Sequence, residues 1–378
     1  MDFGFSEEQD MLRKSARDFL AKESPITYVR RMMEDEVGYS EEVWRKMAAL
    51  GWMGLILPES CGGAGMNMVD LVVVLEEMGR MVMPGPFFAT VLLGALAVLE
   101  GGNDAQKTRY LKSIAAGELK ATLASLEPNG RWDADGIEAT AVADSGGFLL
   151  NGTKLFVPDA HVADLIVVAV RSEKGKGEEG ISLFAVDVPK EGVTITPLKT
   201  MDQTRKLCEV KLEKVRVGPE ALIGRRGGGA AVLKRVTDRA KVALCAEMCG
   251  GAERVLEMSV EYAKVRVQFD RPIGSFQAIQ HKCANMLLLV ESSKSATYYA
   301  AWAVANDVPE APLAAAMAKS YTSDAYRVVA GEGIQIHGGI GFTWEHDMHL
   351  YFKRAKGSEF TFGDATYNRE LVAQLIDL

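Results

Sequence analysis

The chain has 378 residues, of which 43 are Lys or Arg and 51 are Asp or Glu, so its formal net charge at pH 7 is −8. With 48% hydrophobic and 25% charged residues, this is the composition of a globular protein large enough for two or three cores, which excludes disorder and collagen-like repetition. An acidic chain without a long basic run offers no electrostatic basis for binding nucleic acid or anionic lipid non-specifically. No apolar run reaches the roughly 18 residues that predict membrane insertion.

The cysteines indicate packed thiols rather than a disulfide framework. The chain has five of them, none in a CxxC pair, and Cys245 and Cys249 stand at helical i, i+4 spacing. This pattern is typical of a reducing compartment. Met1 to Glu8 is acidic and contains neither the basic nor the apolar region of a leader. We therefore expect a cytoplasmic protein, although a processed mature chain would show the same pattern.

The pattern is helical from Ser6 to about residue 118. Ser6 and Gln9 form a capping box, and the segment that follows places its apolar residues on one stripe of a helix. Residues 41–50 and 69–81 keep the helical period, and the glycine-rich segment 58–65 between them predicts a loop. We expect an N-terminal α-helical domain over residues 1–118.

Near residue 119 the helical period gives way to short β-branched runs. They occupy residues 148–150, 155–157, 165–170, 181–186, 193–196 and 208–212. Turn signals at Gly146-Gly147, Asn151-Gly152 and Pro189 interrupt them. Such a series within about a hundred residues indicates a small antiparallel barrel or sandwich. We expect a middle β-domain over residues 119–222.

The helical period returns at Gly227 and holds to the C-terminus. Residues 230–264, 277–305 and 312–329 are long, apolar-rich helix candidates. Helices of this length that pack side by side form a bundle, which we expect over residues 223–378. The predicted fold class is α+β, with the domains in the order helical, strand-rich, helical.

Several ordered segments resemble the acyl-CoA dehydrogenase family. The two strongest matches are residues 266–280 and 334–345, and shorter ones lie at residues 57–65, 126–128, 150–154 and 224–229. The resemblance covers the whole chain. It implies a middle antiparallel β-barrel and a C-terminal four-helix bundle. It also implies a flavoprotein, usually a tetramer, whose FAD lies between these two domains and reaches a neighbouring subunit with its adenine end.

The resemblance implies cofactor contacts at matching positions near the C-terminus. Arg266 matches an arginine that meets the FAD pyrophosphate, a role suited to its forked guanidinium, and Phe269 would pack on the cofactor. Gln335, Gly338 and Gly339 match a loop that approaches the adenine half from the partner subunit, where glycine lets backbone come close to the ligand. Taken without the neighbouring matches, the composition would instead favour a surface helix charge for Arg266 and a helix cap for Gly338 and Gly339.

On the β-domain side, the resemblance assigns cofactor contacts to Leu126, Phe156 and Pro158. The family's Trp-Ile-Thr reads Phe-Val-Pro here, and a proline offers neither the hydroxyl nor the N–H that would face flavin N5. The family's small, Gly- and Ser-rich stretch after Glu-Pro reads Asn129-Gly-Arg-Trp132 here, and Asp270 replaces the glycine that usually follows the phenylalanine. These departures place bulk and negative charge near an anionic cofactor.

For the acyl-CoA substrate, the resemblance points to Asp238 and Lys241. The family's long helix carries an aspartate there and usually an arginine. Lysine can meet a phosphate or a carbonyl as a point charge but has no fork. For Asp238, an exposed charge on a helix is as good an interpretation as a contact with the substrate.

The expected catalytic base is missing. In the family, the usual base is a glutamate directly before a glycine, and an ungapped count brings these positions to Phe362 and Gly363. Other members place the base on the long helix, at the position of Ala240 here. Asp364 is the nearest carboxylate that could replace the missing base. The alternative is that Asp364 is an ordinary loop or helix-cap aspartate. Glu247, farther along the long helix, is a second stand-in.

Other patterns add no further cofactor. His346 and His349 with Asp347 form too small a set for a metal site, so we expect no metal. His337 is expected to pack near the cofactor rather than to catalyse. The glycines at 227–229 lack the Gly-Lys-Ser/Thr of a P-loop, and no nicotinamide fingerprint follows a strand.

Two functions from different classes fit these observations. The first is FAD-dependent α,β-dehydrogenation of an acyl-CoA to a 2,3-enoyl-CoA, with electrons passed to an electron-transfer flavoprotein. The second is a non-catalytic partner subunit that completes the FAD site of a paralogous acyl-CoA dehydrogenase in a heterotetramer. A flavin oxidase with a different base is a third. We expect an oxidoreductase of the CH–CH class, as a homotetramer or heterotetramer, that binds no nucleic acid.

Overall fold

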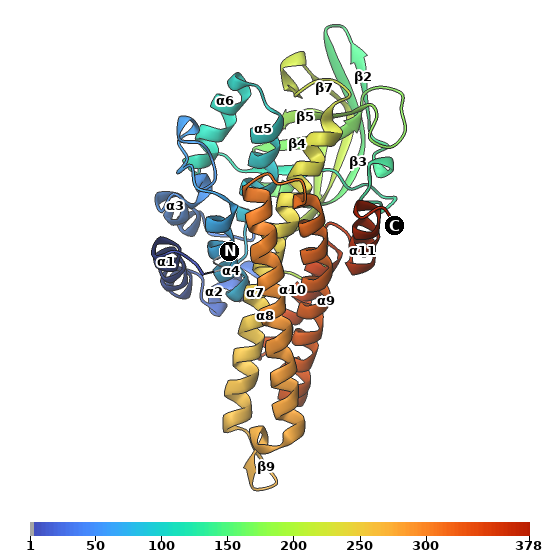
Figure 1. Ribbon diagram of the computed structural model, residues 1–378. Coiled ribbons are helices and arrows are strands. Elements are labelled where there is room, and N and C mark those ends of the chain that lie inside the picture. The colour runs from blue at the N-terminus through green and yellow to red at the C-terminus, as the bar shows by residue number, and fades with distance from the viewer. Residues whose placement is uncertain (1–3) are drawn as a thin grey trace. The chain divides into compact units, whose positions relative to one another are not determined.

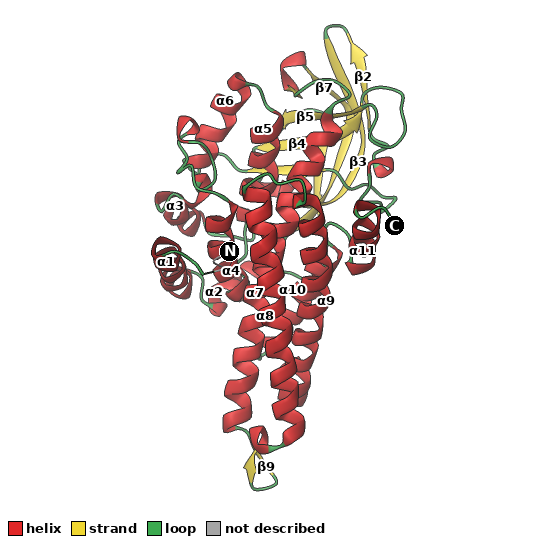
Figure 2. Cartoon of the chain, in the orientation of Figure 1, coloured by secondary structure: helices red, strands yellow, loops and turns green. Residues whose placement is uncertain are grey.

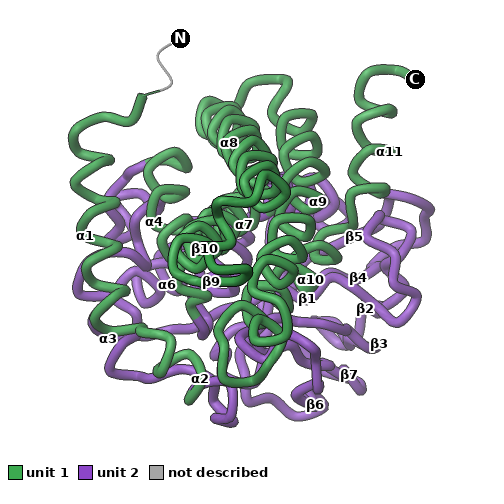
Figure 3. Tube along the Cα trace, turned by 90° about the horizontal axis from the view of Figure 1, so that it is seen from below, with its two compact units in different colours: residues 1–31, 67–83, 241–378 green, residues 32–66, 84–240 purple. Residues whose placement is uncertain are grey.

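The computed structural model describes residues 4–378. It contains two compact units, one of residues 1–31, 67–83 and 241–378 and the other of residues 32–66 and 84–240 (Figure 3). Figure 2 shows helices together with one large sheet, so the predicted α+β fold is confirmed. In the part of the chain that the structure describes, no helix combines the length and the apolar character needed to cross a membrane.

The first unit is helical. Its first helix begins at the predicted capping box, in which the side chains of Ser6 and Gln9 each accept from the other's backbone N–H. Two of its helices, α2 and α7, continue into the second unit. The helices are α1 (Glu7–Glu23), α2 (Ile26–Glu34), α4 (Met68–Arg80), α7 (Gly229–Val265), α8 (Gln277–Ala305), α9 (Ala311–His337), α10 (Met348–Phe360) and α11 (Ala365–Leu375).

Helices α8 and α9 run side by side in the bundle (Figure 1). Helix α8 has the predicted bounds, whereas α9 continues past residue 329 to His337. Gln335, expected in a loop, therefore lies in the last turn of α9. The helix continues because Val329, Gly333 and Ile336 still present a buried face, and it ends where Gly338 takes a φ of +65°.

Helices α4 and α7 cross at two glycines. A Cβ added to Gly79 would lie 1.9 Å from the carbonyl oxygen of Glu247, and one added to Gly250 would lie 1.8 Å from that of Glu76. The two backbones are in contact at this crossing. Only residues without a side chain permit that approach.

The second unit carries the sheet and three shorter α-helices. The helices are α3 (Glu41–Ala49), α5 (Leu96–Gly101) and α6 (Asp104–Ala115). The strands are β1 (Ala121–Ala124), β2 (Thr140–Asp144), β3 (Gly147–Pro158), β4 (Leu165–Arg171), β5 (Ile181–Asp187), β6 (Val193–Pro197), β7 (Leu207–Val217) and β8 (Leu222–Ile223).

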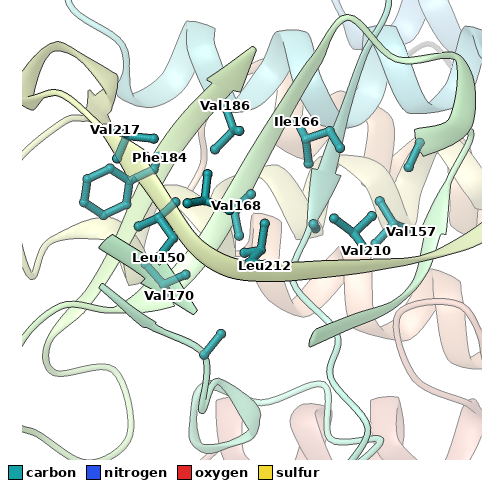
Figure 4. Packing of buried hydrophobic residues seen from close by; sticks show 14 of the residues in the cluster. Leu150, Val157, Ile166, Val168, Val170, Phe184, Val186, Val210, Leu212 and Val217 are labelled. Carbon is teal, nitrogen blue, oxygen red and sulfur yellow. The ribbon is translucent and has the colours of Figure 1, made fainter. Parts of the chain in front are cut away.

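The strands form one sheet in the order β6-β7-β3-β2-β4-β5-β8, with β1 added to β4. Pairing is antiparallel except for β1 with β4 and a single pair between β2 and β4. One face buries an apolar cluster that includes Leu150, Val168, Phe184 and Val210 (Figure 4). This core holds β3 in register, which matters because β3 carries the predicted cofactor residues of the β-domain.

The predicted break at Asn151-Gly152 is wrong. Strand β3 continues through these residues, and the runs 148–150 and 155–157 belong to one strand. The irregularity is a shift in register against β7 between Leu150 and Gly152. Gly152 is needed there because an added Cβ would lie 2.4 Å from the Cβ of Ala139.

Candidate cofactor and substrate site

The first candidate cofactor residues lie on a short hairpin between α7 and α8, made of β9 (Val267–Gln268) and β10 (Arg271–Pro272) (Figure 1). Arg266 precedes it, and its backbone is fixed by hydrogen bonds to Tyr262 and Ile273. The Arg266 side chain is exposed and makes no hydrogen bond or ion pair with any residue from 4 to 378. Its guanidinium is therefore available to a phosphate.

The turn of this hairpin is built from two left-handed residues, Phe269 at φ +53° and Asp270 at φ +61°. This is the backbone of a turn in which Gly is the preferred second residue. Phe269 is 86% exposed, and its ring stands at 82° to that of Phe276, with the ring centroids 6.0 Å apart. An aromatic ring this exposed is available to pack on a ligand.

A second group of candidate residues lies at the C-terminal end of α9. We call Gln335, Gly338 and Gly339 the glycine clasp; all three are exposed. A Cβ built on either glycine would meet nothing within 4 Å, so the backbone can be approached from outside. The hairpin and the clasp thus both present groups suited to an anionic nucleotide.

An open groove of about 650 Å³ borders Gln335. Three cationic side chains from different helices line it, Lys282, Arg327 and Lys356. Each has an acidic partner, Lys282 with Glu332 and the other two with Glu359. Sequence reasoning missed these cations, because nothing in their spacing along the chain shows that they meet.

On the β-domain side, the predicted cofactor residues Phe156 and Pro158 lie at the end of β3, and Leu126 follows β1. Phe156 has a φ of +52° and is 49% exposed, next to a second register shift between Lys154 and Val157. The carbonyl of Pro158 accepts a hydrogen bond of 2.7 Å from Thr122 Oγ1. The carbonyl of Leu126 accepts from the N–H of Leu155 at 2.9 Å. Pro158 itself has no N–H to donate to a ligand.

A buried ion pair supports this end of β3. Lys154 is fully buried, and its Nζ lies 2.5 Å from Oε1 of Glu127. The Glu127 carboxylate also accepts from the backbone N–H groups of Glu138 and Ala139. Burial lowers the pKa of Lys154 to about 8 in spite of the nearby carboxylate. The two motifs that resemble the family at residues 126–128 and 150–154 are thus joined through their charged residues.

The predicted substrate residues both lie on α7. Asp238 is half-buried, and Lys241, three residues farther on, is buried. The ammonium of Lys241 lies 6.0 Å from the centroid of the Tyr367 ring. Lys241 is therefore not a solvated surface charge, and it stands beside α11, which follows the turn where the base was sought.

That turn carries no base at the expected position. Phe362 is 7% exposed and has a φ of +60°, and Gly363 follows at +84°. Asp364 is the N-cap of α11, and its Oδ1 accepts from the N–H of Tyr367 at 2.8 Å. Ala240 and Glu247 on α7 are both buried. The nearest stand-in carboxylate is thus engaged in capping a helix.

Two side chains that sequence reasoning missed hold the turn in place. The buried ammonium of Lys319 donates to Ser323 Oγ at 2.7 Å and to the carbonyls of Glu359 and Gly363, both at 3.0 Å. Asn368 Nδ2 donates to the same Gly363 carbonyl at 3.0 Å. Burial lowers the pKa of Lys319 to about 8. The available signal was that Lys319 directly follows the apolar run 314–318 within a predicted helix.

Three histidines gather near the clasp. His337 and His349 are each 5% exposed, and the ring of His346 lies 4.7 Å from that of His337. No group of three His, Cys, Asp or Glu side chains among residues 4–378 is arranged to hold a metal ion. The ring of His337 stacks on Tyr262 and that of His349 stacks on Trp344.

We expect His349 to make stability depend on pH. Its Nε2 lies 3.2 Å from the Trp344 carbonyl, and its Nδ1 is buried with no hydrogen-bond partner among residues 4–378. Burial therefore lowers the pKa of His349. Below about pH 6.5 the unfolded chain therefore binds a proton that the folded chain does not, and the free energy of unfolding falls as the pH falls. Urea unfolding at pH 7 and 5.5 should show a smaller fall for His349→Phe, which keeps the ring. An equal fall in both proteins would contradict this role.

The residues of the hairpin and the clasp fit FAD, because they combine an available guanidinium with approachable backbone. The residues at the end of β3 fit it less well, since Pro158 lacks the donor that a flavin ring nitrogen requires. The predicted cofactor residues thus differ in their chemistry: the hairpin and the clasp offer groups suited to FAD, whereas Pro158 offers no N–H donor.

Family models match nearly the whole chain. The model for the acyl-CoA dehydrogenase N-terminal domain matches residues 6–118, that for the middle domain residues 122–215, and that for the C-terminal domain residues 227–376. The chain belongs to the acyl-CoA dehydrogenase family. Members of this family are FAD flavoproteins and oxidoreductases that act on CH–CH donors. The predicted family and cofactor class are confirmed, while the domain boundaries and the individual site residues stay predictions.

Individual relatives agree with this assignment. The acyl-CoA dehydrogenase IpdE2 of Mycobacterium tuberculosis is 35% identical over 355 residues, which cover 93% of this chain and 92% of the relative. The structure of butyryl-CoA dehydrogenase from Megasphaera elsdenii superposes with a TM-score of 0.93 at 28% identity and covers 100% of both chains. The ChsE4-ChsE5 complex from Mycobacterium tuberculosis matches with a TM-score of 0.91 at 28% identity, covering 100% of this chain and 99% of the other.

Proposed function

We propose that this chain is the partner subunit of a heteromeric acyl-CoA dehydrogenase. In this role it supplies Arg266, Phe269 and the glycine clasp to an FAD site that a paralogous chain completes. The paralogue carries the base for α,β-dehydrogenation of the acyl-CoA, and the electrons pass to an electron-transfer flavoprotein. The observation that carries the proposal is the apolar, buried Phe362 at the position of the family's base.

The altered positions support this choice over catalysis by the chain's own pocket. Removal of the α proton requires a base that can reach it, and neither Phe362 nor Ala240 can accept a proton. The nearest carboxylate, on Asp364, is held by the backbone of α11. Loss of the base together with loss of the donor at Pro158 is expected of a pocket released from catalysis. A solved relative that is itself a complex of two chains, ChsE4 and ChsE5, supports a mixed assembly.

The exposed groups of the hairpin and the glycine clasp are what this chain would contribute to the FAD site. When bound, FAD supplies the hydride acceptor of the reaction. Arg266 would bind the pyrophosphate through its fork, which places two N–H groups toward two oxygens. Gly338 and Gly339 would allow their backbone N–H groups to approach the nucleotide, because no side chain stands in the way. These contacts orient the cofactor and leave the proton transfer to the paralogue.

Purification of the chain alone and together with a paralogue tests the proposal. We expect colourless protein from the chain alone. Co-expression with a paralogue from the same genome should give a yellow complex of both chains that acyl-CoA bleaches. FAD per chain, native mass and absorbance are the measurements. One FAD per chain and bleaching in the isolated chain would instead establish catalysis in its own site.

Asp364→Asn separates the two functions further. Asparagine also caps helices well, so the folded turn and α11 are expected to persist. We expect turnover of the complex to change by less than about twofold, since in the proposal Asp364 takes no proton. If Asp364 is a base, turnover should fall by about 10² to 10⁴. Thermal unfolding of the same preparation controls for loss of the cap.

A further inference from the structure

The segment that follows the glycine clasp is held by an arginine from α2. The clasp leads into a short 3-10 helix, η8 (Gly338–Phe342), and residues 343–347 then connect it to α10. Arg30 donates to the carbonyls of Trp344 at 2.7 Å and His346 at 3.1 Å. Its Nη2 and Nε both donate to Oδ1 of Asp347, at 2.8 and 3.1 Å. One planar guanidinium thus fixes three acceptors of this connection.

This connection packs on the last residue of α9. The ring centroids of His346 and His337 lie 4.7 Å apart. The His337 ring also stacks on the ring of Tyr262 of α7, with the two centroids 4.4 Å apart. His337 Nδ1 lies 2.7 Å from the Gly333 carbonyl, one turn back along α9. His337 therefore has its position set by α7, by its own helix and by the segment that Arg30 holds.

The position of His337 in turn governs the path of the clasp. The next residue, Gly338, reverses the chain with a φ of +65°. The chain then folds back so closely that a Cβ on Gly341 would lie 2.8 Å from the Cβ of His337. The backbone of Gly338 and Gly339 spans this short return, so a shift of His337 would move it.

We propose that Arg30 is a positioning residue for the glycine clasp. By holding residues 344–347 against His337, it fixes the backbone that receives the nucleotide end of FAD. The identity of the ligand, FAD, rests on the proposed function. The role of Arg30 in fixing the backbone of the clasp rests on the contacts above.

The chemistry of arginine suits this task. Its ion pair with Asp347 is partly exposed, with 23% and 34% of the two side chains accessible, and such a pair contributes little alone. The bonds to two backbone carbonyls add direction, because the donors of a guanidinium lie in one plane at fixed angles. A lysine can keep the charge but cannot reach all three acceptors from one position.

The test uses the assembly that carries FAD, with Arg30→Gln and Arg30→Lys. Arg31→Gln, the adjacent exposed arginine of the same helix, is the matched control. We expect Arg30→Gln to speed release of FAD on dilution about tenfold, with a smaller effect for Arg30→Lys. Hydrogen exchange of the amides of residues 338–342 should also be faster in Arg30→Gln, while α8 keeps its protection.

The two measurements separate the inference from the proposed function. Unchanged exchange at residues 338–342 in Arg30→Gln would overturn the inference, whatever happens to FAD. Faster exchange with unchanged FAD release would support Arg30 as the positioning residue of the segment and overturn the assignment of the clasp to FAD. If Arg30→Gln does not fold, Arg30→Lys and Asp347→Asn give the same comparison with milder changes.

Discussion

Gly250→Ala is expected to destabilise the helical unit by at least about 3 kcal/mol, the upper range for overpacking a core. The added methyl would lie 1.8 Å from the Glu76 carbonyl oxygen of α4. Side-chain rotation cannot relieve this clash, because the atom it meets belongs to the backbone. The two helices would have to move apart, and the contacts on both sides of the crossing would loosen. Chemical unfolding of the purified chain measures the loss.

Gly331→Ala is the matched control for this prediction. Gly331 also lies within a long helix of the bundle, α9, but a Cβ there meets nothing within 4 Å. Alanine is better than glycine in a helix by up to about 1 kcal/mol, so this variant should be as stable as the parent or more stable. Equal stability of the two variants would show that the close crossing of α4 and α7 is not what requires glycine at 250.

Glu127→Gln is expected to cost about 3 kcal/mol at pH 7, because it leaves the ammonium of Lys154 buried without its counter-charge. Both side chains are almost completely buried, so solvent does not screen the pair. The loss should shrink as the pH rises above 8, since the pKa of Lys154 is already lowered to about 8 and its neutral amine does not need a carboxylate. Unfolding in urea at pH 7 and pH 9.5 tests both statements.

Glu138→Gln provides the comparison for the buried pair. Glu138 is a nearby glutamate of the same domain, but it is exposed. Its replacement should change the free energy of unfolding by less than about 0.5 kcal/mol at either pH. A loss at Glu127 no larger than this would mean that the ion pair does not support β3.

Much of the helical architecture could be predicted from local pattern. The capping box at Ser6 and the bounds of α8 follow from residues within one or two turns of each other, and the structure agrees. The errors lie where a contact distant in sequence overrides a local signal. Asn151-Gly152 has the composition of a turn, but pairing with β7 carries the strand through it. Helix α9 continues past residue 329 because its buried face continues.

In the candidate site, too, some features follow from the sequence alone and others depend on contacts between distant residues. The absence of a carboxylate at Phe362 is visible in the chain itself, since no folding can turn a phenyl ring into a base. That Asp364 caps α11 and that Lys319 braces the turn became visible only with the helices in place. Capping aspartates and catalytic aspartates are the same residue type, and only their neighbours distinguish them.

The order of residues along this chain was sufficient to predict its family, its fold class and its cofactor class. These depend on residue identity and on spacing within short segments. The tertiary structure decided which distant groups meet: Arg30 with the segment after the clasp, Lys154 with Glu127, and Gly79 and Gly250 at a helix crossing. The physical reason is that a hydrogen bond, an ion pair or a steric contact acts over a few ångströms in space. Separation along the chain carries no information about that distance until the helices and the sheet have packed.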